Sequence, residues 1–205
     1  MTEGAKQAMR LHRLERRRAT PPAARAAAAA ELARRLLALD FLASPARIAA
    51  YWPFGTEPSP LPAYDLLRAR GSTVLLPVGR ADGDVDWAEL LDADALTRGR
   101  WGFAEPAGPL LGVAAIAGVD VVIVPALAVD AGGGRLGRGS GSYDRALARV
   151  RPGVPIVAIV YDDEVVAAVP MEPHDRPVTH IVTPRRTLVV GPGVVGSGSG
   201  LISQD

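Results

Sequence analysis

The sequence lacks cysteine, long apolar runs and an appreciable net charge. Without cysteine, the chain has no disulfide, no thiolate metal site and no cysteine nucleophile. A formal net charge of +1 gives the molecule as a whole no electrostatic attraction to nucleic acid or membranes. No apolar run reaches transmembrane length, and the basic N-terminal stretch lacks the apolar core of a signal peptide. We therefore expect a cytoplasmic protein that binds neither nucleic acid nor membrane.

Several common catalytic patterns are also missing. The three histidines, His12, His174 and His180, do not have metal-ligand spacing, so a zinc site is not expected. No nucleophile elbow and no Ser/His/Asp pattern is visible. His174 stands beside Asp175, and the sequence leaves open whether it is a metal ligand, an acid or part of a turn. Any chemistry should therefore depend on phosphate, arginine and magnesium rather than on covalent catalysis.

Apolar segments alternate with helical patterns along most of the chain. Helices are predicted at residues 5–18, from Thr20-Pro21-Pro22 onward with Thr20 as the cap, and at 61–71. Residues 101–106 are expected to form a turn-rich connection. Strands are predicted at residues 47–54, 72–78, 85–90, 119–127, 155–161 and 179–184.

This alternation predicts an α/β fold, with three layers (α/β/α), a mostly parallel central sheet and two preceding N-terminal helices. We expect a single domain over residues 1–190. The Gly/Ser-rich stretch 191–205 is expected to be a disordered tail.

The most informative segment is VDVVIVPALAVDAGGGRLGRGSGSYDRAL, residues 119–147. An apolar strand leads into a glycine-rich loop, and an amphipathic segment follows. Glycines allow backbone N–H groups to approach an anion closely, as in phosphate-binding loops. Arg135 and Arg138 lie within the loop and could clamp a phosphate, and Asp144 could hold magnesium. The loop is neither GxxxxGK[ST] nor a clean GxGxxG, so phosphate binding is predicted outside the common nucleotide-binding folds.

The remaining candidates each keep two interpretations. Lys6 and Arg10, four residues apart on a helix, could clamp a polyphosphate or belong to a solvated basic face. Glu57 follows two aromatic residues and could accept N–H groups of a flat heterocycle or simply be solvated. Trp101 could stack on a ligand or cover the core, and Tyr143 at the helix start is equally open. Four segments that follow predicted strands could meet at the carboxyl edge of the sheet: residues 52–57, 101–105, 135–144 and 172–175.

Six motifs occur in order along the chain: KxxxR near the start, YxPFxxE, VLLP, WGxxEP, VDVVIVPALAVDxxGxRLGRGxGxYDR and EPHDxPV. In these motifs the chain resembles the 5-formyltetrahydrofolate cyclo-ligase family, also called methenyltetrahydrofolate synthetases. The resemblance extends to about residue 190. The loop motif and EPHD together are its most specific part.

The resemblance implies an ATP-dependent ligase that converts 5-formyltetrahydrofolate to 5,10-methenyltetrahydrofolate through a phosphorylated formyl intermediate, with release of ADP and phosphate. Its substrates would be the folate and ATP, its cofactor Mg²⁺, and its expected state a monomer. Arg138 would be catalytic, and Asp144 and Asp175 would position Mg²⁺. The folate-binding residues would be Trp52, Glu57, Trp101 and Tyr143. The ATP-binding residues would be Lys6, Arg10, Arg135, Leu136, Gly137, Arg138, Gly139, Ser140, Gly141, Ser142 and Tyr143.

The chain departs from the family pattern within the loop. Where the family usually has GxGYYD, this chain has GSGSYD, with Ser142 in place of a tyrosine near the folate. Ser140 also stands where a larger or basic residue is common. One alternative is therefore a paralogous ATP-dependent ligase acting on another metabolite, such as a thiamine-related one. A second is a non-catalytic nucleotide- or RNA-binding module that uses the basic helix 5–18.

Overall fold

Alternating apolar residues on the strands face the two sides of a central sheet. In β6 (Val121–Pro125), Val121 and Ile123 belong to one core cluster, whereas Val122 and Val124 belong to the other. A strand that is apolar on both faces is typical of a parallel sheet covered on both sides. The computed structural model, which describes residues 3–172 and 175–191, has this arrangement.

Seven strands of the described residues form the central sheet, in the order β12-β11-β9-β6-β1-β2-β3. The five inner strands are parallel, and the edge strands β12 and β3 are each antiparallel to their neighbour. Besides β6, the strands are β1 (Arg47–Ala49), β2 (Thr73–Gly79), β3 (Val85–Glu89), β9 (Ile156–Ile159), β11 (His180–Val182) and β12 (Thr187–Val189). The predicted α/β fold with a mostly parallel sheet is confirmed.

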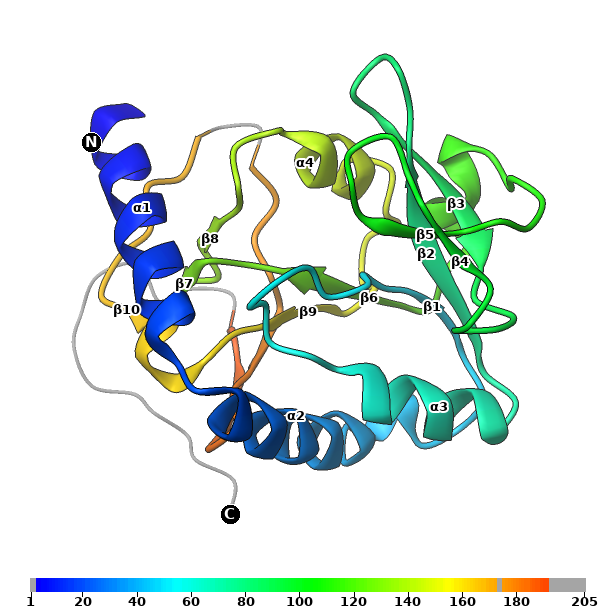
Figure 1. Cartoon of the computed structure of the whole chain (residues 1–205), viewed down its shortest axis with the longest axis horizontal. Coiled ribbons are helices and arrows are strands. Elements are labelled where there is room, and N and C mark those ends of the chain that lie inside the picture. Colours follow the sequence, from blue (N-terminus) through cyan, green and yellow to red (C-terminus); the bar gives the residue numbers. More distant parts are fainter. Residues whose placement is uncertain (1–2, 173–174, 192–205) are drawn as a thin grey trace.

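Helices cover both faces of this sheet (Figure 1). On one face α2 (Pro22–Leu37) and α3 (Leu61–Ala69) bury leucines such as Leu32, Leu36 and Leu67. On the other face lie the 3₁₀ helix η2 (Val113–Gly118) and α4 (Ser142–Leu147), which bury Ile116, Ala146 and Leu147. None of the helices in the described parts of the chain is both long and apolar enough to span a membrane.

The first helix, α1 (Glu3–Ala19), lies apart from the central sheet, beside a three-stranded sheet (Figure 1). This small sheet consists of β10 (Val165–Val166), β7 (Ala128–Asp130) and β8 (Arg135–Leu136). Met9 and Leu14 of α1 pack against its core cluster. The remaining elements are the β4–β5 hairpin (Leu96–Arg98, Ala104–Pro106) and two 3₁₀ helices, η1 (Asp40–Leu42) and η3 (Asp162–Glu164).

Several local predictions need correction. The strand predicted at 47–54 ends at Ala49, where the chain leaves the sheet. Thr20 does not cap α2: Pro21 occupies that position, and the Thr20 hydroxyl donates to the Arg16 carbonyl at the end of α1. Residues 104–106, expected to be turn, form β5. Strands β1 and β5 have three residues each, which is too short to show a period-two pattern. Of the predicted tail, only Gly191 lies within the described residues.

Candidate functional site

One cavity of about 380 Å³ opens at the carboxyl ends of the central strands. It is lined by Tyr51 just beyond β1, by Gly79 at the end of β2 and by Pro125 at the end of β6. Ligands of open α/β sheets bind at this edge. Of the four segments expected to converge there, residues 52–57, 101–105 and 135–144 all contribute lining residues. The fourth, which contains Glu172 and Asp175, lies instead against Lys6 of α1.

The glycine-rich loop between β8 and α4 forms one wall of this cavity. Gly139 and Gly141 have φ angles of +98° and +67°, a region that L-residues with a side chain rarely adopt. The backbone N–H groups of residues 138–141 donate to no other residue that the structure describes. Such free, closely spaced donors are the groups that bind a phosphate in a concave loop. The loop can therefore bind an anion through its backbone.

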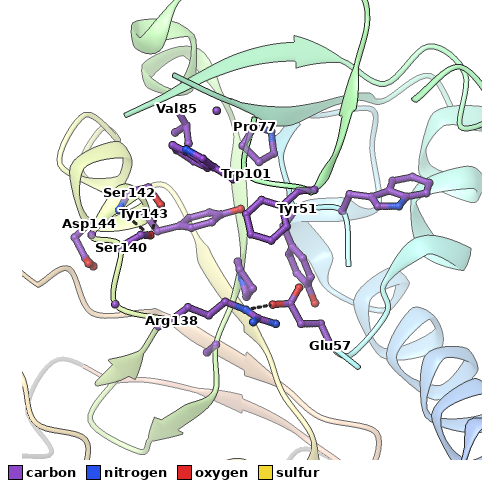
Figure 2. Close-up of a pocket in the computed structure, with 18 of the residues that line it drawn as sticks. Tyr51, Glu57, Pro77, Val85, Trp101, Arg138, Ser140, Ser142, Tyr143 and Asp144 are labelled. Atoms are coloured by element: carbon purple, nitrogen blue, oxygen red, sulfur yellow. Dashed lines mark hydrogen bonds and ion pairs between the residues drawn. The ribbon is translucent and has the colours of Figure 1, made fainter. Parts of the chain in front are cut away.

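Arg138 and Glu57, from opposite walls of the cavity, are joined by an ion pair. The Arg138 Nε donates to Glu57 Oε1 at 2.9 Å (Figure 2). The Phe54 N–H donates to Glu57 Oε2 at 2.9 Å. The Glu57 side chain is only 7% exposed, whereas that of Arg138 is 35% exposed. The guanidinium also lies 5.6 Å from the centre of the Phe54 ring. A buried carboxylate and an accessible cation thus adjoin within one cavity.

Tyr143 points into the cavity between Trp101 and the Arg138–Glu57 pair (Figure 2). Its hydroxyl is buried and has no hydrogen-bond partner among the described residues. Burial, followed by the nearby charge of Glu57, raises the pKa of Tyr143, so the phenol stays neutral and keeps its proton. A buried hydroxyl normally finds a partner, and this one is therefore available to a ligand.

Trp101 forms the opposite, aromatic side of the cavity. Its indole lies on Gly79, where an added Cβ would be 2.9 Å from the ring. Glu105, on the neighbouring strand β5, accepts the Gly79 N–H at 2.9 Å and occupies the space where a Cβ on Gly99 would lie. The two glycines thus allow Trp101 and Glu105 to pack closely beside the end of β2. Trp52 also lines the cavity and packs against the core beneath it.

Ser140 and Ser142 line the cavity where bulkier residues are expected from the motif. Their hydroxyl oxygens are 2.9 Å apart, and Ser142 is buried at the first position of α4. Leu136, in contrast, packs in the core of the small sheet and does not line the cavity. Its side chain is a structural anchor for the loop that follows.

Several basic residues of α1 contact the rest of the protein. Lys6 is 8% exposed and lies 2.6 Å from a Glu172 carboxylate oxygen and 3.9 Å from one of Asp175. The Arg10 Nε donates to the Gly137 carbonyl at 3.2 Å, which joins α1 to the glycine loop. Of the two interpretations of Lys6, the solvated face is therefore excluded.

Further along α1, Arg13 donates to the Asp163 carbonyl, and Arg17 is buried in an ion pair with Glu164. Positions 6, 10, 13 and 17 lie on one face of a helix, so a single basic stripe faces inward. The RNA-binding alternative requires these basic side chains at the surface, but their contacts hold them against the protein.

Residues 2–184 match the model of the 5-formyltetrahydrofolate cyclo-ligase family. The chain belongs to this family. It is 38% identical over 194 residues to the 5-formyltetrahydrofolate cyclo-ligase of Mycolicibacterium smegmatis, covering 92% of this chain and 98% of the relative. It is 28% identical over 179 residues to that of Escherichia coli K12, covering 84% of this chain and 96% of the relative.

Solved structures agree with this assignment. The NMR structure of Aquifex aeolicus 5,10-methenyltetrahydrofolate synthetase matches with a TM-score of 0.77 and 26% identity, covering 94% of this chain and 96% of that one. The synthetase from Mycoplasma pneumoniae shares the fold, with a TM-score of 0.69 and 19% identity over 86% of this chain and 96% of that one. The α/β architecture of this cyclo-ligase family member is thus shown independently of its motifs.

The two carboxylates expected to hold magnesium have basic neighbours in this family member. Asp144 accepts a hydrogen bond from Arg135, and Asp175 accepts the Glu172 N–H at 2.8 Å and lies near Lys6. Residues 3–172 and 175–191 contain no cluster of three or more potential ligands. His174 lies outside the described residues. The carboxylate oxygens of Asp144 and Asp175 are of the kind that Mg²⁺ binds in proteins.

Pro77 and Val85 line the cavity outside the segments expected from the sequence, whereas Phe103 and Glu105 lie within the expected segment 101–105 but were not named as site residues. Pro77, Val85, Phe103 and Glu105 complete the wall around Trp101. The sequence contains an indication for two of these residues. Pro77 lies near the carboxyl end of a predicted strand, and Glu105 belongs to the WGxxEP motif. The antiparallel return of β3, which places Val85 opposite Gly79 at the end of β2, left no such indication.

Proposed function

We propose that this protein converts 5-formyltetrahydrofolate and ATP to 5,10-methenyltetrahydrofolate, ADP and phosphate. The observation that carries the proposal is the 2.9 Å contact between Arg138, on the anion-binding loop, and Glu57, on the opposite wall. Transfer of a phosphoryl group to a formyl oxygen requires the nucleotide and the folate to meet within one cavity. Membership of the cyclo-ligase family supplies the reaction.

The nucleotide phosphates would bind along the glycine loop. The free N–H groups of residues 138–141 suit phosphate oxygens, and Arg138 has terminal nitrogens that donate to no described residue. Arg135, Leu136 and Tyr143 would fix the ends of the loop, while Lys6 and Arg10 would face the outer phosphates from α1. Arg138 would stabilise the charge that develops during transfer.

The folate would occupy the aromatic side of the cavity. The Glu57 carboxylate would accept N–H groups of the pterin. One of its oxygens, Oε2, already accepts the Phe54 N–H, and this bond holds the carboxylate in place. Trp101 and Trp52 would pack against the ring system, and the free Tyr143 hydroxyl would donate to the substrate. Burial of these groups excludes water from the reacting atoms.

The chemistry proceeds in two bond exchanges. The formyl oxygen attacks the γ-phosphorus, the bond to the leaving ADP oxygen breaks, and the formyl carbon becomes electrophilic. Nitrogen 10 then attacks this carbon and loses its proton, and the carbon–oxygen bond breaks as phosphate leaves. The contribution of the protein is to position the two substrates and to neutralise phosphate charge, which accounts for most catalysis of phosphoryl transfer.

Magnesium would enter with the nucleotide. Asp144 and Asp175 are the carboxylates that would hold it, directly or through water, and Arg135 orients Asp144. When bound, the ion would neutralise phosphate charge.

An absorbance assay tests the proposal. The purified protein would be mixed with 5-formyltetrahydrofolate, ATP and magnesium, with ATP omitted as the control. ATP-dependent growth of the ultraviolet band of methenyltetrahydrofolate, with one ADP released per product, is expected. No product from an enzyme that binds both substrates would contradict the proposal.

A second candidate rests on Ser142. Because this small, buried residue replaces the tyrosine of the motif, the cavity has room for a ligand other than a reduced folate. An ATP-dependent ligase of the same fold could then act on another formyl- or amide-bearing metabolite. ADP release with such a compound, together with no binding of 5-formyltetrahydrofolate, would favour this candidate.

A further inference from the structure

Arg145 ends the loop motif, and the mechanism above gives it no role. It lies in the first turns of α4, and its side chain reaches back over the glycine loop. Its Nη2 donates to the Gly83 carbonyl in the turn between β2 and β3, and also to the Ser140 carbonyl at 3.3 Å. One guanidinium therefore joins the glycine loop to a turn about sixty residues earlier in the chain.

Glycines make room for this guanidinium on both sides. A Cβ on Gly141 would lie 3.0 Å from Arg145 Nη1, and one on Gly83 would lie 3.3 Å from Nη2. Both glycines have positive φ angles, of +67° and +83°. A side chain at either position would be strained and would crowd the arginine. Two separate backbone segments, at Gly83 and Gly141, thus pack closely against the Arg145 guanidinium.

The contact also determines which backbone groups the loop presents to the cavity. The Ser140 carbonyl is held by Arg145, and the Gly137 carbonyl is held by Arg10. The N–H groups between them, at residues 138–141, remain without a described acceptor. A carbonyl that turned toward bound phosphate would repel its oxygens. Two arginines therefore fix the loop with its donors available.

We propose that Arg145 is a positioning residue that holds the glycine loop in its anion-binding conformation. The inference rests on the proposed function, since it assigns the loop to the nucleotide phosphates. Arg145 does not line the cavity itself. It acts through the Ser140 carbonyl, so its loss frees the loop to present that carbonyl instead of its N–H groups.

Arg149 provides a matched control. It lies one turn further along the chain, and its Nη1 and Nη2 are 3.1 and 2.5 Å from the two carboxylate oxygens of Asp84. It therefore fastens the same β2–β3 turn as Arg145 does, but no described contact joins its side chain to the glycine loop. If Arg145 served only to fasten the turn, replacing Arg149 would have the same effect.

The test compares the dissociation constants of a non-hydrolysable ATP analogue with magnesium and of 5-formyltetrahydrofolate, measured by calorimetry on full-length variants. Arg145→Ala should weaken the analogue by about tenfold and change folate binding little, because a charged hydrogen bond to the loop is lost. Arg149→Ala should leave the analogue affinity within about twofold of the unaltered protein. Arg145→Lys keeps a charged donor, so its affinity for the analogue should lie between those of Arg145→Ala and Arg149→Ala.

A rescue experiment separates positioning from a general effect on folding. Arg145 is exposed, so added ethylguanidinium can enter the space left in Arg145→Ala and should restore much of the analogue affinity. Equal analogue affinity in Arg145→Ala and the unaltered protein would overturn the inference, as would an equal loss in Arg149→Ala. If the unaltered protein bound no nucleotide, the proposed function itself would fail.

Discussion

Two Arg–Glu ion pairs in this protein have nearly the same parts. Arg17–Glu164 joins α1 to η3, and Arg138–Glu57 joins the glycine loop to the opposite wall of the cavity. In each pair a backbone N–H donates to the glutamate, from Tyr161 or Phe54, at 2.8 and 2.9 Å. In each, the aromatic ring of that same residue lies near the guanidinium, at 5.8 and 5.6 Å.

The pairs differ in how completely the arginine is used. Arg17 contacts both Glu164 oxygens, at 2.6 and 2.8 Å, and donates to the Ala126 carbonyl as well, and both side chains are 3% exposed or less. Arg138 has one contact with Glu57 and remains 35% exposed. The saturated pair can only hold the structure together, whereas Arg138 keeps donors for a ligand. Saturation therefore separates the structural pair from the pair to which the proposed function assigns a role.

Breaking the buried pair should have the largest effect. Arg17→Ala leaves Glu164 charged and unpaired in the interior, so the free energy of unfolding should fall by about 3–5 kcal/mol. Urea denaturation of the purified variant measures this. Replacing both partners, as Arg17→Met with Glu164→Leu, should recover most of the loss. If Arg17→Ala lowered the free energy of unfolding by less than about 1 kcal/mol, the pair would not contribute substantially to stability.

Breaking the cavity pair from the arginine side should change the rate instead. Arg138→Ala should lower kcat by on the order of a hundredfold or more, because phosphate charge is no longer neutralised. Its free energy of unfolding should fall by less than that of Arg17→Ala, since Arg138 is partly exposed and Glu57 keeps the N–H donated by Phe54. Steady-state kinetics and urea denaturation on one preparation give both values. Unchanged turnover would exclude Arg138 from catalysis.

Breaking the same pair from the glutamate side should separate the two substrates. Glu57→Gln keeps the size of the side chain but removes its charge, so it should weaken folate binding by about tenfold. Binding of ATP should be unaffected within about twofold. Separate calorimetric titrations with each substrate measure this, and an equal loss of both would indicate a misfolded cavity.

Restoring the family residue at position 142, in the same cavity, should have the smallest effect. Ser142→Tyr adds an aromatic ring to the cavity wall and should tighten binding of the reduced folate by roughly two- to tenfold. Fluorescence titration with 5-formyltetrahydrofolate gives the dissociation constant. A weaker or unchanged constant would mean that the cavity has adapted to serine, which would favour the second candidate function.

The cavity pair could be anticipated from the sequence, but the buried pair could not. Glu57 and Arg138 each follow a predicted strand, and the carboxyl ends of parallel strands meet at one edge. Arg17 and Glu164 are 147 residues apart, and each type is rarely buried. Nothing in the local pattern identifies two such residues as partners.

The fold, too, could be predicted from the sequence in part only. The long apolar runs containing β2, β6 and β9 could be predicted because each is buried on both faces. The two-residue strands β8 and β10 have no periodicity of their own and exist because β7 pairs with them. Local sequence thus predicts the layers, while pairing with β7 determines the short strands beside it, including β8, from which the glycine loop starts.

The contacts of α1 also have a consequence for the order of events during synthesis. Its basic stripe binds residues that follow it by 109 to 166 positions in the chain, from Ala126 to Glu172. Because a ribosome adds about 5–20 residues per second, the helix is made on the order of ten seconds before those partners. The first helix of the chain is therefore among the last elements to be fixed in place, and an unfinished chain cannot complete the proposed nucleotide site.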